Sequence, residues 1–115
     1  MKLIIAGSRD ITPLQFEEAL QEIRQDFEME VTEIVSGNAR GVDKYGEQVA
    51  KENSLALTVF KPDWSKGKPA GIIRNKEMGD YADALFAVWD GQSKGTKHMI
   101  DYMIGLGKPV QVVIK

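Results

Sequence analysis

Residues 3–9 read LIIAGSR, a short apolar run that ends directly in a turn of glycine and polar residues. The same succession recurs at residues 36–41 (SGNARG) and 91–96 (GQSKGT), each between an apolar run and a helix-like stretch. In a parallel sheet, such turns expose helix N-terminal N–H groups at the carboxyl ends of the strands, where an anion is favoured. The pattern therefore predicts an α/β fold with a phosphate-binding site at that edge.

Strand-like and helix-like segments alternate along the whole chain. The predicted strands are residues 3–6, 31–35, 55–60, 84–89 and 109–114, and the predicted helices are residues 13–27, 42–53, 69–81 and 95–106. A capping box of Thr12 and Gln15, with Pro13 at the first helical position, marks the start of the first helix.

This alternation indicates βαβ units and one five-stranded parallel sheet with helices on both faces. We expect a Rossmann-like three-layer sandwich with the strand order 3-2-1-4-5. That order would place the turns after strands one and four beside each other, facing one ligand. A chain of 115 residues is expected to form a single domain, residues 1–115.

Composition excludes several classes of site. The chain has no cysteine, so it has neither a disulfide framework nor a thiolate nucleophile, and its one histidine argues against a metal site. The apolar run at the N-terminus is too short for a signal peptide or a membrane span, so we expect a cytoplasmic protein without a membrane partner. The net charge of −2 argues against a dominant nucleic-acid footprint.

The turn after the fourth predicted strand offers donors to a phosphate. Gly95 allows close approach of the backbone, and Thr96 supplies a hydroxyl and an N–H. A Walker motif is excluded because no lysine stands between Gly95 and Thr96. A tight turn that needs glycine only for its geometry is the alternative, and this motif alone leaves both open.

The turn after the second predicted strand places Arg40 between Gly37 and Gly41, and we expect Arg40 to contact an anion. Asp43 either binds a ribose hydroxyl or lies in the first helical turn, where its carboxylate complements the helix dipole. We favour the dipole role for Asp43.

Residues 61–76 contain five basic residues and one acid, Asp63, which would attract a polyanion or a nucleotide. Trp64 either stacks on a base or anchors the loop to the core. Arg74 shares a helix face with Gly71, which would let a ligand approach it, although an ordinary surface arginine is the alternative. Asp90 follows the fourth strand, where ribose-binding and catalytic acids lie, or it forms an Asx-type turn.

Three segments together resemble the SLOG superfamily, which includes the Lonely Guy cytokinin-activating enzymes, the DprA family and the YspA/YpsA-like proteins. They are residues 72–78 (IIRNKEM), 82–89 (ADALFAVW) and 91–96 (GQSKGT). Residues 7–9 (GSR) and 36–43 (SGNARGVD) are especially similar to the small YspA-type branch, so the resemblance spans nearly the whole chain.

The resemblance implies a Rossmann-like domain that binds a nucleotide or a nucleotide-derived ligand, with Gly95 and Thr96 on the phosphate and Arg74 at the motif arginine. It does not by itself imply catalysis. The Lonely Guy pattern P-G-G-x-G-T-x-x-E ends in a catalytic glutamate, and Met99 occupies that position here. A thioether cannot stabilise the oxocarbenium-like state of N-glycosidic cleavage as a carboxylate does.

Three functions are therefore open. The first is the binding or sensing of a nucleotide-like ligand, without a further cofactor. The second is nucleoside 5′-monophosphate phosphoribohydrolysis, with Arg74 and Asp90 as catalytic candidates. The third is single-stranded DNA binding of the DprA kind. The resemblance also implies a homo-oligomer, a dimer or higher. The candidate ligand-binding residues are Gly7, Ser8, Arg9, Ser36, Gly37, Arg40, Gly41, Arg74, Asn75, Asp90, Gly91, Ser93, Gly95 and Thr96.

Overall fold

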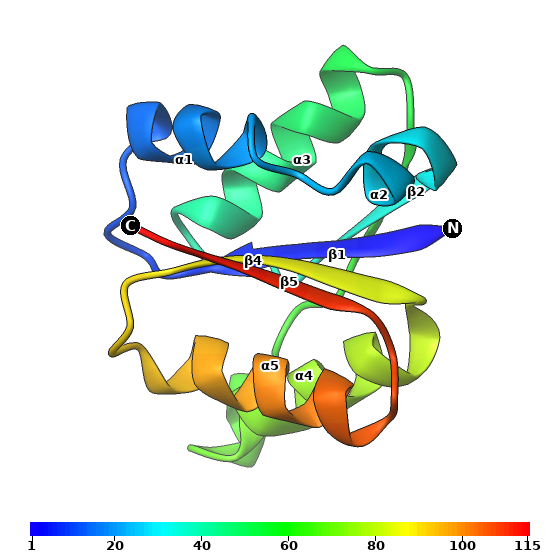
Figure 1. The fold of residues 1–115 in the computed structure, drawn as a ribbon. Coiled ribbons are helices and arrows are strands. Elements are labelled where there is room, and N and C mark those ends of the chain that lie inside the picture. The colour runs from blue at the N-terminus through cyan, green and yellow to red at the C-terminus, as the bar shows by residue number, and fades with distance from the viewer.

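Five parallel strands form the central sheet in the computed structural model, which describes residues 1–115 (Figure 1). The strands are β1 (Lys2–Gly7), β2 (Glu33–Ser36), β3 (Ala56–Val59), β4 (Ala84–Trp89) and β5 (Val110–Ile114). Their order is β3-β2-β1-β4-β5, which confirms the predicted topology. Strands are added toward one edge of the sheet from β1 to β3 and toward the other edge from β4 to β5. The turns that follow β1 and β4 are therefore neighbours.

Helices cover both faces of the sheet, as predicted. Figure 1 shows α1 (Pro13–Leu20), α2 (Gln25–Glu30) and α3 (Val42–Glu52) above the sheet. The other face carries α4 (Ala70–Tyr81) and α5 (Lys94–Gly105), and a short 3₁₀ turn, η1 (Trp64–Lys66), precedes α4. No helix is long and apolar enough to span a bilayer.

Two apolar cores flank the sheet because alternate residues of β1 and β4 point to opposite faces. Leu3 and Ile5 belong to the core beneath α1, α2 and α3, together with Phe16 and Phe27. Ile4 and Ala6 belong to the opposite core, which α4 and α5 complete with Met78, Met99 and Met103. The continuous apolar runs in the sequence are thus those of strands buried on both faces.

The first predicted helix, residues 13–27, is wrong as a single element, although its capping box of Thr12 and Gln15 is confirmed. α1 ends at Leu20 and α2 begins at Gln25. A side chain from β5 stabilises the break, since Gln111 Nε2 donates to Glu22 O at 2.6 Å and Gln111 Oε1 accepts from Arg24 N at 2.7 Å. Phe27, on α2, is fully buried in the core despite the break.

Gly46 allows α3 to pack closely on β1. A Cβ atom at Gly46 would lie 2.8 Å from Ile5 Cβ, whereas a Cβ at Gly71, on the other helical layer, would meet nothing within 4 Å. We therefore expect Gly46→Ala to lower the free energy of unfolding by about 1–3 kcal/mol through overpacking. Gly71→Ala is the matched control and should raise it by about 0.5–1 kcal/mol. Urea unfolding of both variants checks this, and equal effects would contradict the close packing.

Candidate ligand-binding site

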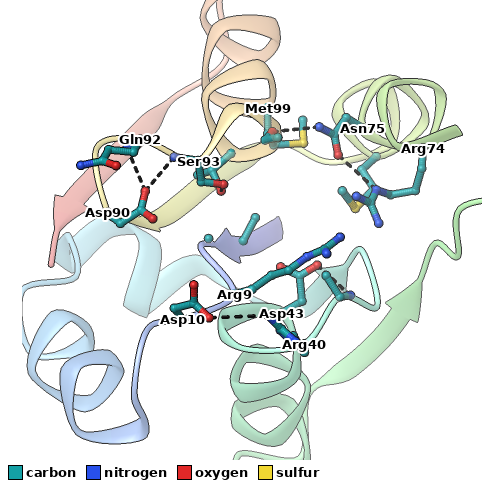
Figure 2. A pocket seen from close by; sticks show the side chains of 16 residues that line it. Arg9, Asp10, Arg40, Asp43, Arg74, Asn75, Asp90, Gln92, Ser93 and Met99 are labelled. Carbon is teal, nitrogen blue, oxygen red and sulfur yellow. Dashed lines mark hydrogen bonds and ion pairs between the residues drawn. The ribbon is translucent and has the colours of Figure 1, made fainter. Parts of the chain in front are cut away.

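The carboxyl edge of the sheet carries a cavity of about 470 Å³ (Figure 2). Its walls come from the end of β1, the turns after β1, β2 and β4, the start of α3, and α4 and α5. The residues lining it are Ala6, Gly7, Arg9, Asp10, Ala39, Arg40, Asp43, Arg74, Asn75, Met78, Asp90, Gln92, Ser93, Gly95, Thr96 and Met99.

Most residues of the predicted site lie in this one cavity. They are Gly7, Arg9, Arg40, Arg74, Asn75, Asp90, Ser93, Gly95 and Thr96. Figure 2 shows Arg9 and Arg40 on one wall, Arg74 and Asn75 on the facing wall, and Asp90 and Ser93 at the third side. The structure therefore brings the first and third glycine turns together, as the strand order requires.

The remaining predicted residues do not line the cavity but shape its turns; they are Ser8, Ser36, Gly37, Gly41 and Gly91. Ser8 is buried, and its Oγ accepts a hydrogen bond from Asp90 N at 3.0 Å. Gly41 has a φ of +79°, and a Cβ there would lie 2.6 Å from Arg9 O. The first and second turns therefore touch at a point where only glycine fits.

The N-terminus of α5 presents unpaired donors to the cavity. Lys97 N donates to Ser93 O at 3.1 Å, and no backbone or side-chain acceptor lies on the amides of Lys94, Gly95 or Thr96. Such first-turn amides, together with the helix dipole, favour an anionic group. Gly95 and Thr96 both line the cavity, so this end of α5 borders it.

Asp90 orders the turn that leads into α5. Its Oδ1 accepts from Gln92 N and from Ser93 N, both at 2.8 Å, which is the geometry of an Asx-type turn. The Ser93 and Gln92 amides hold the pKa of the Asp90 carboxyl below its ordinary value. Asp90 is therefore a carboxylate that occupies two of the turn's amides itself.

Arg74 is fixed by two hydrogen bonds. Its Nη1 donates to Gly37 O, and its Nε donates to Asn75 Oδ1 at 3.1 Å. Burial lowers the pKa of Arg74, the neighbouring Asp43 carboxyl raises it, and the nearby Arg9 lowers it further. Since arginine remains protonated despite such shifts, Arg74 and Arg9 place two cations close together at the cavity.

Asn75 connects this arginine to the donors of α5. Its Nδ2 donates to Gly95 O at 3.1 Å and lies 3.2 Å from His98 Nδ1. Because Asn75 lies buried on α4 and donates to Gly95 O, it links α4 to the first turn of α5.

Asp43 lies in the wall of the cavity rather than only at the start of a helix. The side chain is buried, and its Oδ2 accepts from Ala39 N at 3.1 Å. Burial raises the pKa of Asp43 to about 6, against the opposing effects of the Ala39 amide and the Arg74 cation. A Cβ at Gly37 would lie 2.9 Å from both Asp43 Oδ2 and Arg74 Nη1, so the missing side chain is what lets these groups approach.

Sequence reasoning missed several other lining residues. Asp10 follows Arg9 in the first turn and lies 3.6 Å from Arg40 in an exposed ion pair. Met99 is buried and lines the cavity as an apolar group. The signal for Asp10 was its place in a glycine turn that the strand order brings to the site.

A family model described as "YspA, cpYpsA-related SLOG family" matches residues 1–67. The matched range includes β1, β2, β3 and the first two glycine turns, and thus Arg9, Arg40 and Asp43. The third turn and the two helices of the opposite layer lie outside it. No curated protein and no solved structure matches the chain.

The raised pKa of Asp43 makes stability depend on pH. Between its ordinary value of 3.8 and about 6, the folded chain holds a proton on Asp43 that the unfolded chain has released. The stabilisation is therefore complete below about pH 4 and is lost as the pH rises through 6. Relative to Asp43→Asn, the free energy of unfolding of the natural chain should fall by about 3 kcal/mol over this window.

Urea unfolding of both chains from pH 4 to pH 7 measures this difference, and carbon NMR of the Asp43 carboxyl should give a midpoint near 6. Asp90 is the internal control, since its pKa lies below the ordinary value. A midpoint for Asp43 near 3.8 would contradict its burial as an acid in this wall.

Proposed function

Because the chain belongs to the YspA, cpYpsA-related SLOG family, we propose that it binds a nucleotide or a nucleotide-derived phosphorylated ligand in the cavity at the carboxyl edge of the sheet. The observation that carries this proposal is the meeting of unpaired amides at the N-terminus of α5 with the cations Arg9 and Arg74 in one cavity. Backbone donors and guanidinium groups are the partners that phosphate oxygens prefer.

In this arrangement the phosphate lies on the amides of Gly95 and Thr96, with Arg9 closing over it. Arg9 is exposed and forms no ion pair within the chain, so it is free to bind the ligand. Arg40 forms one ion pair, with Asp10, and this exposed pair is weak enough for a ligand to replace it. Ser8 and Asp90 do not touch the phosphate in this proposal but keep the turn in shape.

The opposite part of the cavity suits the sugar of a nucleotide. Asp43 and Asp10 are acceptors there, and carboxylates accept hydrogen bonds from ribose hydroxyls. The lining contains three arginines and three aspartates, so its side chains carry little net charge. The side-chain charges therefore give the cavity little net attraction for a phosphate, and the amides of α5 supply the remaining attraction.

Calorimetric titration with adenosine 5′-monophosphate as the probe tests the phosphate site. Arg9→Ala should weaken binding by about tenfold or more, because it removes a charge-assisted contact from an otherwise unchanged fold. Lys51→Ala is the matched control, since it removes an exposed cation from the far end of α3 and should leave the affinity unchanged. Equal losses in the two variants would contradict the site, and so would the absence of binding to the natural chain.

One observation favours a second candidate function, phosphoribohydrolysis. Asp43 places a carboxyl group with a pKa near neutrality in the same cavity, which is a property of general bases. In this candidate water attacks C1′ of the bound nucleotide, the C1′–N bond breaks, and Asp43 takes the proton of the attacking water. The base leaves with the bonding electron pair and is protonated by solvent. Asp43 then takes the role of the Lonely Guy glutamate, in whose place this chain has Met99.

Incubation with adenosine 5′-monophosphate and chromatography for free adenine separates the two functions. If the chain is a hydrolase, adenine should accumulate over many turnovers, and Asp43→Asn should abolish its release while AMP still binds. Asp90→Asn is the second arm, because Asp90 is one of the two catalytic candidates from the sequence, with Arg74. Binding without adenine release would establish a ligand-binding protein and refute hydrolysis of this nucleotide.

A further inference from the structure

A second, smaller cleft of about 250 Å³ adjoins the proposed phosphate site. Arg74 lines both, so the two depressions meet at this residue. The second cleft carries the cations Lys61 and Lys66 and the acids Asp63 and Glu77. A ligand that extends past Arg74 would enter it.

Trp64 stands between two residues of that cleft, Asp63 and Lys66, and is 60% exposed. This exposure rules out the role of an anchor to the core, which sequence reasoning had left open. A large aromatic side chain in water carries a cost that a bound partner would remove, and a base stacks well on such a surface.

The turn that holds Trp64 is closed by its own hydrogen bonds. Asp63 Oδ1 accepts from Ser65 N at 3.1 Å and from Ser65 Oγ at 2.5 Å, and Gly67 N donates to Trp64 O at 3.0 Å. These bonds pre-form the loop, so little conformational entropy is lost when it binds.

The loop also carries unneutralised positive charge. Lys61, Lys66 and Lys68 are exposed, and none of them forms an ion pair within the chain. The hydrogen bonds from Ser65 lower the pKa of the Asp63 carboxyl, and Lys66 lowers it further, so one carboxylate lies among these three lysines. The charge and the exposed aromatic together match a unit made of a phosphate and a base.

We propose that residues 61–68 and the adjoining cleft form a second subsite, which takes the next unit of a ligand at least two nucleotides long. The linking phosphate lies on Lys61 and Lys66, and the second base stacks on Trp64. This inference rests on the proposed function, because the first phosphate lies at α5. The ligand is a pair of nucleotides linked by a phosphate, and either a free dinucleotide or the end of a single strand has this chemistry.

Titration of the full chain with three probes tests the subsite: adenosine 5′-monophosphate, the 5′-phosphorylated dinucleotide pApA and a 5′-phosphorylated deoxyadenosine decamer. The dinucleotide should bind at least about tenfold more tightly than the mononucleotide, which is the gain expected from one stacked base. Trp64→Ala should abolish this gain without changing the mononucleotide affinity, and Trp64→Phe should keep most of it. A decamer tighter than pApA identifies a strand end, and equal affinities identify a free dinucleotide.

Lys61→Ala and Lys66→Ala should weaken the binding of pApA and reduce the salt dependence of its affinity, while Lys51→Ala should change neither. Equal affinities for the mononucleotide and pApA, with Arg9→Ala weakening both, would overturn the subsite and leave the phosphate site standing. A gain for pApA that survives Trp64→Ala would also overturn it. If none of the three probes binds, the proposed function fails together with the subsite.

Discussion

The close approach of β1 and β4 at Gly7 is the constraint on which the carboxyl edge of the sheet depends. Gly7 pairs with Val88 in the parallel register, and a Cβ at Gly7 would lie 2.1 Å from Val88 O. The next amide, Ser8 N, donates to that same carbonyl at 3.1 Å, and Ser8 Oγ then accepts from Asp90 N. The ends of the two central strands are thus joined through one short segment, and the turns that follow them must meet.

The fold could be predicted because its main signals are local. β1 and β4 are apolar on both faces, and the glycine turns and the Thr12 capping box mark where elements begin and end. The break between α1 and α2 could not be predicted, because Gln111 stabilises it from a strand 87 residues away in sequence. Periodicity continues through that break, since Phe27 still faces the core.

The site was predictable to the extent that strand order brings turns together. Glycine turns are recognisable in a sequence. Gly7, Arg9, Gly95 and Thr96 could therefore be predicted as parts of one site, and they line one cavity. The environment of Asp43 was not, because it arises from groups on separate elements: the Ala39 amide, the gap at Gly37 and the guanidinium of Arg74. The exposure of Trp64 likewise depends on how η1 lies against α4, which composition does not encode.

The contact between Asn75 and His98 determines where the imidazole carries its proton. Asn75 Oδ1 accepts from Arg74, so Nδ2 is the atom that faces His98 Nδ1, and an amide nitrogen can only donate. As the acceptor in this contact, Nδ1 carries a lone pair, which corresponds to the neutral ring with its hydrogen on Nε2. Burial and the neighbouring Lys76 lower the pKa of His98, in keeping with this tautomer, against the opposing effect of Asp101. Acidification turns acceptor into donor at that nitrogen and sets two hydrogens against each other, which loosens the tether between α4 and the start of α5.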